Sequence, residues 1–262
     1  MKTRNLKIIN TLAFAVMIAV NALANLLHLG GNTTGQVSEA YPNLFTPAPI
    51  TFAIWGIIYL FMAAFVLYQW EIFDKGEISG EIRERIGYWF SVSCLLNIAW
   101  IFFWHFNILL ASVICILALQ VVIIIILVKF HPMEGNKRAF RMVNAGFDIY
   151  FGWIIVATIV NSIVLAVQMD WNLFLSQQVM WTEIIILIGS AIGTGIVLIT
   201  KKWLMGVAMI WAYAGVLFQY YITGMAKNYL SLIVTLFISS ALIMGAIFFV
   251  NFGEEYEEDV VA

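Results

Sequence analysis

The stretch FTPAPITFAIWGIIYLFMAAFVLYQW, residues 45–70, contains no charged side chain. About 20 mostly apolar residues are enough for a helix to cross the hydrocarbon core of a bilayer, at a rise of about 1.5 Å per residue. In lipid, a single segment can satisfy its own backbone polar groups only as a helix. Residues 48–70 are therefore expected to form a membrane-spanning helix.

The same composition extends along the whole chain of 262 residues, which is 63% hydrophobic and 11% charged. Soluble domains carry roughly 25% charged residues, so this balance excludes a soluble enzyme. A net charge of -2, without a long basic run, excludes a nucleic-acid partner. The apolar runs lack the alternation of a membrane barrel, so we predict an all-α, polytopic bundle of eight transmembrane helices in the lipid bilayer. The predicted spans are approximately 7–29, 48–70, 87–106, 108–129, 142–168, 178–200, 203–224 and 228–251.

The lysine and arginine residues indicate the orientation of the spans. Twelve of the thirteen lie before the first span or in alternate connections, and only Lys227 lies on the other side. Because basic residues are enriched on the cytoplasmic side, both termini of this multi-pass protein are expected in the cytoplasm, with the cell membrane as its location. The start of the chain also resembles a signal peptide, but its long apolar run contains Asn10 and Asn21, which favours a span.

Polar and aromatic side chains form stripes at helical spacing on four of the predicted spans. In lipid such side chains mark the interior of a bundle. Indole rings can stack on a flat apolar ligand while an amide anchors its polar edge, and packing between helices is the alternative explanation for each stripe. The stripes are Asn21, Asn25 and His28; Trp55 and Tyr59; Ser93, Asn97, Trp100 and Trp104; and Trp153, Ala157 and Asn161.

Two carboxylates, Asp148 and Glu183, fall within spans near opposite ends. A deeply buried carboxylate would indicate proton or ion coupling, whereas shallow ones are explained by hydration or by pairing with a base. Arg141 and Lys202 are both candidate partners of Asp148. No set of His, Cys and carboxylate residues has metal-ligand spacing, and no acid–base constellation is present, so we predict no metal site and no catalytic residue.

Three motifs, in this order, resemble the TspO/MBR family of translocator proteins and tryptophan-rich sensory proteins. They are residues 45–59, LNIAW at 96–100 and WIIVATIVN at 153–161. The resemblance covers about residues 7–168 and implies a five-helix unit with a pocket under the first outer loop, residues 30–47, where family members bind porphyrins and other flat apolar molecules. Carried over by position, the ligand-binding residues would be Trp55, Tyr59, Asn97, Trp100, Trp153 and Asn161, and the first-span stripe adds Asn25.

The chain departs from the five-helix pattern by its three further spans. We divide it into a TspO-like unit (1–170), three added helices (171–252) and an acidic cytoplasmic tail (253–262). A proline usual before the fifth-helix tryptophan is missing. Family members often dimerise, and Gly189 and Gly193 offer a candidate contact for a homodimer or for packing within the chain.

These observations favour an integral membrane receptor or sensor that binds a small, flat hydrophobic ligand. The resemblance implies a porphyrin or another tetrapyrrole as that ligand, and no other cofactor is expected. The alternative is a secondary transporter or permease for a small hydrophobic molecule, in which the three added spans would form a moving partner. Light-driven porphyrin breakdown, proposed for some relatives, leaves a third, enzymatic interpretation open.

Overall fold

The computed structural model describes residues 2–72, 77–130 and 138–261, and every regular element within them is a helix. The long helices are α1 (Lys2–Leu26), α3 (Ile54–Gln69), α5 (Trp89–His105), α6 (Leu109–Phe130), α7 (Arg138–Gln168), α9 (Gln178–Thr200), α10 (Trp203–Ile222) and α11 (Leu230–Val261). The short ones are η1 (Leu29–Gly31), α2 (Thr34–Glu39), η2 (Pro49–Ala53), α4 (Glu77–Ile86), α8 (Asn172–Ser176) and η3 (Met225–Lys227).

Seven helices in the described residues are long and apolar enough to cross a membrane. An eighth span results when Gly80–Ile86 and Trp89–His105 are taken together, although this pair is bent by 54°. Gly87 lies at the bend with a φ of 56°, a left-handed conformation that costs glycine little because it has no Cβ. The predicted all-α polytopic membrane bundle is confirmed.

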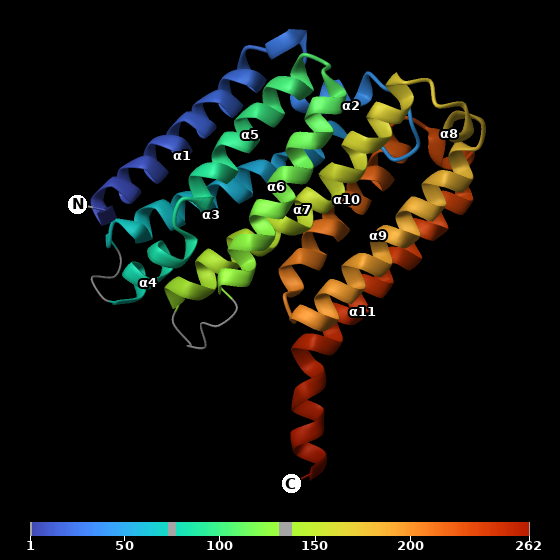
Figure 1. Cartoon of the computed structure of the whole chain (residues 1–262). Helices are drawn as coiled ribbons and strands as arrows, with labels where there is room; N and C mark the ends of the chain where they lie inside the picture. The colour runs from blue at the N-terminus through green and yellow to red at the C-terminus, as the bar shows by residue number, and fades with distance from the viewer. Residues whose placement is uncertain (1, 73–76, 131–137, 262) are drawn as a thin grey trace.

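The helices form two groups, which Figure 1 shows leaning against each other. One group contains α1, α3, α5, α6 and α7, and the other contains α9, α10 and α11. Helix α10 joins them because it packs against α7 as well as against α9 and α11. Gly152 of α7 allows this close approach, since a Cβ there would overlap with the backbone of Met205.

Gly189 and Gly193 of α9 face α10. A Cβ at Gly189 would lie 2.8 Å from the Tyr213 hydroxyl, and one at Gly193 would lie 2.7 Å from the Met209 sulfur. The two glycines therefore allow helices of the same chain to pack closely, which is one of the two interpretations given above. A second copy of the chain would need a different face.

Basic side chains gather at the end of the bundle that holds the start of α1. Lys7 reaches the segment after α3, and Arg85 of α4 donates to the Lys129 carbonyl at the end of α6. These residues come from connections that the sequence assigned to one side of the membrane. The acidic segment predicted as a tail continues α11 to Val261, beyond the rest of the bundle (Figure 1).

Candidate functional site

A cavity of about 590 Å³ lies between α1 and α3, beneath the segment that joins them, residues 27–53, here called the first loop. Its volume falls within the range of about 300–1,000 Å³ that is usual for small-molecule sites. Exposed Leu26 and exposed Gly56 are both in its wall, so the cavity opens sideways between the two helices. The other lining residues are Ile18, Asn21, Ala22, Asn25, Thr33, Thr34, Gly35, Pro49, Phe52, Ala53, Trp55 and Tyr59.

Trp55 forms the back of this cavity and the centre of an aromatic cluster. Its ring stacks on Tyr59, with the centroids 5.6 Å apart, and lies 5.3 Å from the ring of Trp100. Tyr150 and Trp153 meet it edge-on at 5.7 and 6.3 Å. These distances and angles are those that aromatic pairs prefer. Trp55 thus presents a flat, supported surface to whatever enters between α1 and α3.

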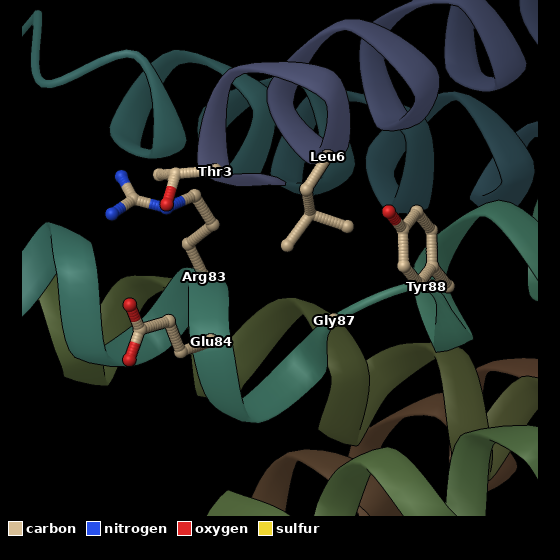
Figure 2. A pocket seen from close by; sticks show the side chains of 6 residues that line it. All are labelled: Thr3, Leu6, Arg83, Glu84, Gly87 and Tyr88. Atoms are coloured by element: carbon tan, nitrogen blue, oxygen red, sulfur yellow. The ribbon is translucent and has the colours of Figure 1, made fainter. Parts of the chain in front are cut away.

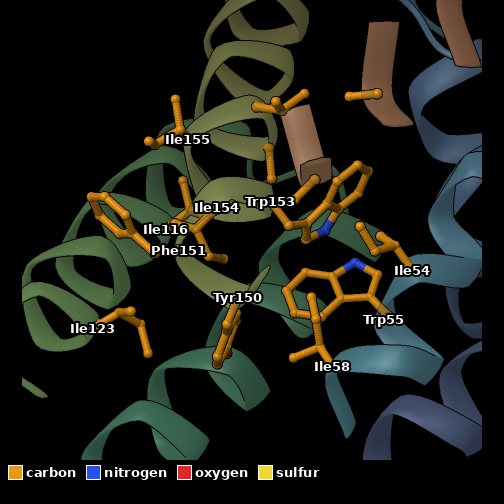
Figure 3. Close-up of a cluster of buried hydrophobic side chains, with 14 of the residues drawn as sticks. Ile54, Trp55, Ile58, Ile116, Ile123, Tyr150, Phe151, Trp153, Ile154 and Ile155 are labelled. Carbon is orange, nitrogen blue, oxygen red and sulfur yellow. The ribbon is translucent and has the colours of Figure 1, made fainter. Parts of the chain in front are cut away.

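Three hydrogen-bond donors in this cluster lack a partner among the described residues: the indole nitrogens of Trp55 and Trp153 and the hydroxyl of Tyr59. Figure 3 shows the two indole nitrogens on the sides of their rings that face each other. Buried polar groups are normally paired, and an unpaired one is costly. All three atoms are enclosed by neighbouring side chains, so a ligand in the cavity could accept from them only after those side chains had moved.

The two predicted amides of α5 and α7 are held by neighbouring side chains. Asn97 Oδ1 accepts from Asn21 Nδ2 at 2.7 Å, which links α5 to the cavity wall on α1. Asn161 Oδ1 accepts from Trp100 Nε1 at 3.2 Å and from the Ser112 hydroxyl at 2.6 Å. These bonds fix the orientation of the Trp100 ring on which Trp55 rests.

The predicted site residues thus form two layers. Asn25, Trp55 and Tyr59 line the cavity. The second layer, buried behind Trp55, consists of Asn97, Trp100, Trp153 and Asn161. A direct contact of the second layer with a ligand stays a prediction, whereas its support of Trp55 is a feature of the structure.

Thr34 and His105, to which sequence reasoning gave no role, fasten the first loop to α5 together with Asn25 and Trp104, which it had placed on inward stripes. Asn25 Oδ1 accepts from the Thr34 backbone nitrogen at 3.1 Å, and the Thr34 hydroxyl lies 3.1 Å from His105 Nε2. The other ring nitrogen of His105 lies 2.8 Å from the Leu29 carbonyl, and Trp104 donates to the Thr34 carbonyl. The partners of His105 lie more than seventy residues away, and His105 itself carries no motif.

Helix α10 fastens the other half of the first loop, which sequence reasoning also missed. Three hydrogen bonds between distant residues make this connection. They run from Ala48 N to Gly215 O (3.0 Å), from Trp211 Nε1 to Thr51 O (2.8 Å) and from the Tyr220 hydroxyl to Leu44 O (2.6 Å). The helices beyond the five-helix unit therefore help to build the cavity.

A sequence model of the family described as TSPO-like protein matches residues 7–249, which include α9, α10 and most of α11. The chain belongs to the TSPO-like protein family. Membership makes it a multi-pass membrane protein of the sensor or receptor type. Comparison with curated proteins and comparison with solved structures each found no match.

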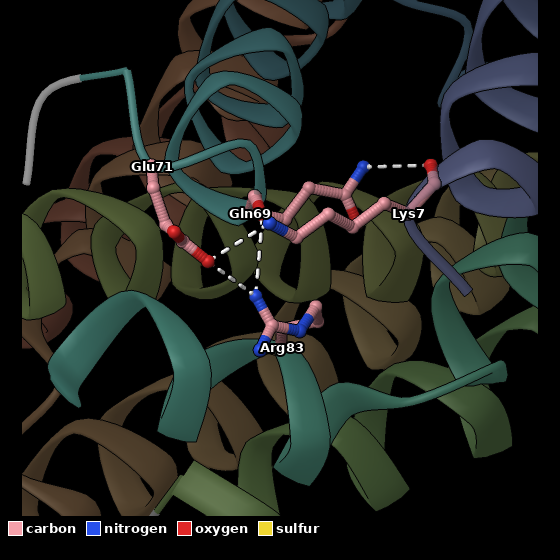
Figure 4. Close-up of polar contacts among 4 residues, drawn as sticks. All are labelled: Lys7, Gln69, Glu71 and Arg83. Atoms are coloured by element: carbon pink, nitrogen blue, oxygen red, sulfur yellow. Dashed lines mark hydrogen bonds and ion pairs between the residues drawn. The ribbon is translucent and has the colours of Figure 1, made fainter. Parts of the chain in front are cut away.

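At the opposite end of this TSPO-like protein, charged residues tie α1, α3 and α4 together (Figure 4). The Glu71 carboxylate accepts from Lys7 Nζ at 2.8 Å and from Arg83 Nη1 at 3.0 Å. These two hydrogen bonds lower the pKa of Glu71. Beside Arg83 lies a cavity of about 440 Å³ (Figure 2), whose other lining residues are Thr3, Leu6, Glu84, Gly87 and Tyr88.

Asp148 pairs with Lys202, which decides between its two candidate partners. Lys202 Nζ donates to Asp148 Oδ1 at 2.7 Å and to Asn144 Oδ1 at 2.8 Å. Asp148 is 4% exposed and is therefore more deeply buried than a hydrated carboxylate would be. The pair links α7 to the start of α10, so it joins the two groups of helices. Glu183 is half-buried on α9, away from this pair.

Proposed function

We propose that this TSPO-like protein is an integral membrane receptor for a flat hydrophobic ligand of the tetrapyrrole class, bound between α1 and α3. The observation that carries this proposal is the position of Trp55. Its ring backs the cavity, rests on other aromatic rings and bears an indole N–H without a partner among the described residues. A flat ring stacked there would gain apolar contact and the stacking that aromatic pairs prefer.

The cavity combines an apolar back with a polar rim, as expected for a ligand that is flat in the middle and polar at its edge. Trp55, Phe52 and Ile18 contribute apolar surface. Asn21 and Asn25 lie one helical turn apart on α1 and bring amide groups to the same cavity. A few convergent polar groups in an apolar pocket fix the orientation of a ligand.

We infer that both termini lie in the cytoplasm and that the cavity opens in the outer half of the cell membrane. The cluster of Lys7 and Arg83 at the opposite end of the bundle supports this orientation because basic residues are enriched on the cytoplasmic side. The sideways opening beside Leu26 and Gly56 gives an apolar ligand a route from the lipid.

Titration of the detergent-purified protein with protoporphyrin IX tests the proposal. Binding is read from the absorbance of the porphyrin, so that loss of a tryptophan does not alter the signal. Trp55→Leu should raise the Kd at least tenfold because the stacking surface is lost. Trp203→Phe is the matched control. Trp203 is 41% exposed at the start of α10 and does not line the cavity.

Two further variants test the supporting layer. Asn97→Ala and Trp100→Ala should raise the Kd less than Trp55→Leu does, because both lie behind the cavity wall. Saturable binding that Trp55→Leu leaves unchanged would overturn the assignment of the site. Absence of any saturable binding would overturn the ligand class.

A further inference from the structure

A separate cavity of about 360 Å³ lies where the first loop meets the second group of helices. It is formed by the end of α2 and the residues after it, the start of α9, the end of α10, η3 and the residue that precedes α11. The lining residues are Glu39, Pro42, Asn43, Leu44, Thr46, Gln178, Gln219, Met225 and Tyr229. It shares none of them with the cavity between α1 and α3.

Gln219 supplies a fixed acceptor to this cavity. Its side-chain nitrogen donates to Glu39 Oε1 at 3.1 Å. A carboxylate only accepts hydrogen bonds, so the amide nitrogen must face Glu39, which leaves Oε1 as the free end. Gln219 is 8% exposed, and its Oε1 has no partner among the described residues. A buried acceptor of this kind calls for a donor.

The remaining lining side chains define the charge of that donor. Glu39 brings a carboxylate that forms no ion pair within the described part of the chain, and none of the lining residues is lysine, arginine or histidine. Tyr229 adds an aromatic ring, held 6.0 Å from that of Tyr220. A carboxylate, an amide oxygen and an aromatic ring around one small cavity favour a cation with several N–H donors.

We propose that this cavity binds a small molecule that carries a primary ammonium group. The ammonium has three donors, which can be shared between Glu39 and the Oε1 of Gln219, while the Tyr229 ring covers its remaining face. A bound amine would bridge the first loop and α10, so the site would connect these two parts of the protein.

Isothermal titration of the full-length protein in detergent, with putrescine as the probe at constant ionic strength, tests this site. The wild type should bind putrescine saturably. Glu39→Gln removes the charge but keeps an oxygen that can accept from Gln219, so the fold should persist. Gln219→Met keeps the length of the side chain but removes the acceptor. Each variant should raise the Kd at least tenfold.

Two controls make the result specific. Glu183→Gln removes a carboxylate from α9 outside the cavity and should leave the Kd within twofold of that of the wild type. Butane-1,4-diol, which has the length of putrescine but no charge, should not bind. The proposal is overturned if putrescine binding does not saturate, if the diol binds equally well, or if the properly folded Glu39→Gln variant binds as tightly as the wild type. None of these outcomes depends on the porphyrin titration.

Discussion

The indole nitrogen of Trp211 donates to the carbonyl oxygen of Thr51 at 2.8 Å, across 160 positions of the chain. This bond ties α10 to η2, whose last residue directly precedes α3. Trp55 follows one turn later, at the back of the cavity between α1 and α3. The position of the Trp55 ring is therefore set partly by a helix that lies outside the five-helix unit.

Trp211→Phe should weaken ligand binding without a direct loss of ligand contact. The variant keeps an aromatic ring but loses the hydrogen bond to Thr51, which is worth about 1 kcal/mol. We expect the first loop to be cleaved faster by added protease and the Kd for protoporphyrin IX to rise several-fold. Trp203→Phe should change neither quantity. Equal cleavage rates in both variants would show that the bond does not hold the loop.

Gly215→Ala should destabilise the junction between α10 and the first loop. A Cβ at this position would overlap with the side chain of Thr51. Such overpacking costs about 1–3 kcal/mol, which exceeds the gain of up to about 1 kcal/mol in helix propensity. Thermal unfolding in detergent should show a lower Tm. Gly245→Ala, where a Cβ would meet no atom within 4 Å, should leave the Tm equal or higher.

Asp148→Asn should lower the Tm strongly because it leaves the ammonium of Lys202 buried without its counter-charge. Breaking one side of a buried ion pair costs about 3–5 kcal/mol, whereas replacing both partners costs much less. The double variant Asp148→Asn, Lys202→Met should therefore recover most of the Tm. A receptor should keep its porphyrin affinity in the double variant. Loss of uptake into proteoliposomes, with binding retained, would instead favour the transporter.

The contribution of Glu71 to stability should depend on pH. Lys7 and Arg83 lower the pKa of Glu71 below its ordinary value of 4.5. A carboxylate whose pKa is lowered by folding stabilises the folded state at pH values above its ordinary pKa. This stabilisation is lost as the pH falls through the lowered pKa. The Tm difference between wild type and Glu71→Gln should thus be largest at neutral pH and should shrink as the pH falls below the ordinary value of 4.5. Glu84→Gln, which removes an exposed carboxylate without an ion pair in the described residues, should show no such trend.

Much of the fold followed from composition and local patterns. The apolar run of residues 48–70 and its counterparts predicted the long helices, because lipid leaves a single segment no other way to pair its backbone. The third predicted span departs from a straight helix, because the segments Gly80–Ile86 and Trp89–His105 meet at an angle of 54° beside Gly87. A glycine permits such a bend, but the sequence alone does not show whether it occurs.

The candidate site was only partly predictable. Helical spacing placed Asn25, Trp55 and Tyr59 on inward faces, and they do line one cavity. The same spacing could not predict that Trp55 lines the cavity while Trp100 lies behind it, because these positions depend on how closely the helices pack.

Composition and helical periodicity alone predict a bundle of membrane-spanning helices and the faces of those helices that point inward. Both follow from the cost of exposing polar groups to lipid, which acts on each segment separately. The pairing of Lys202 with Asp148, and the bond by which Trp211 of α10 holds the first loop, arise from the way in which the helices pack together. Those contacts join residues far apart in the chain, so they depend on the relative placement of whole helices, which no local pattern encodes.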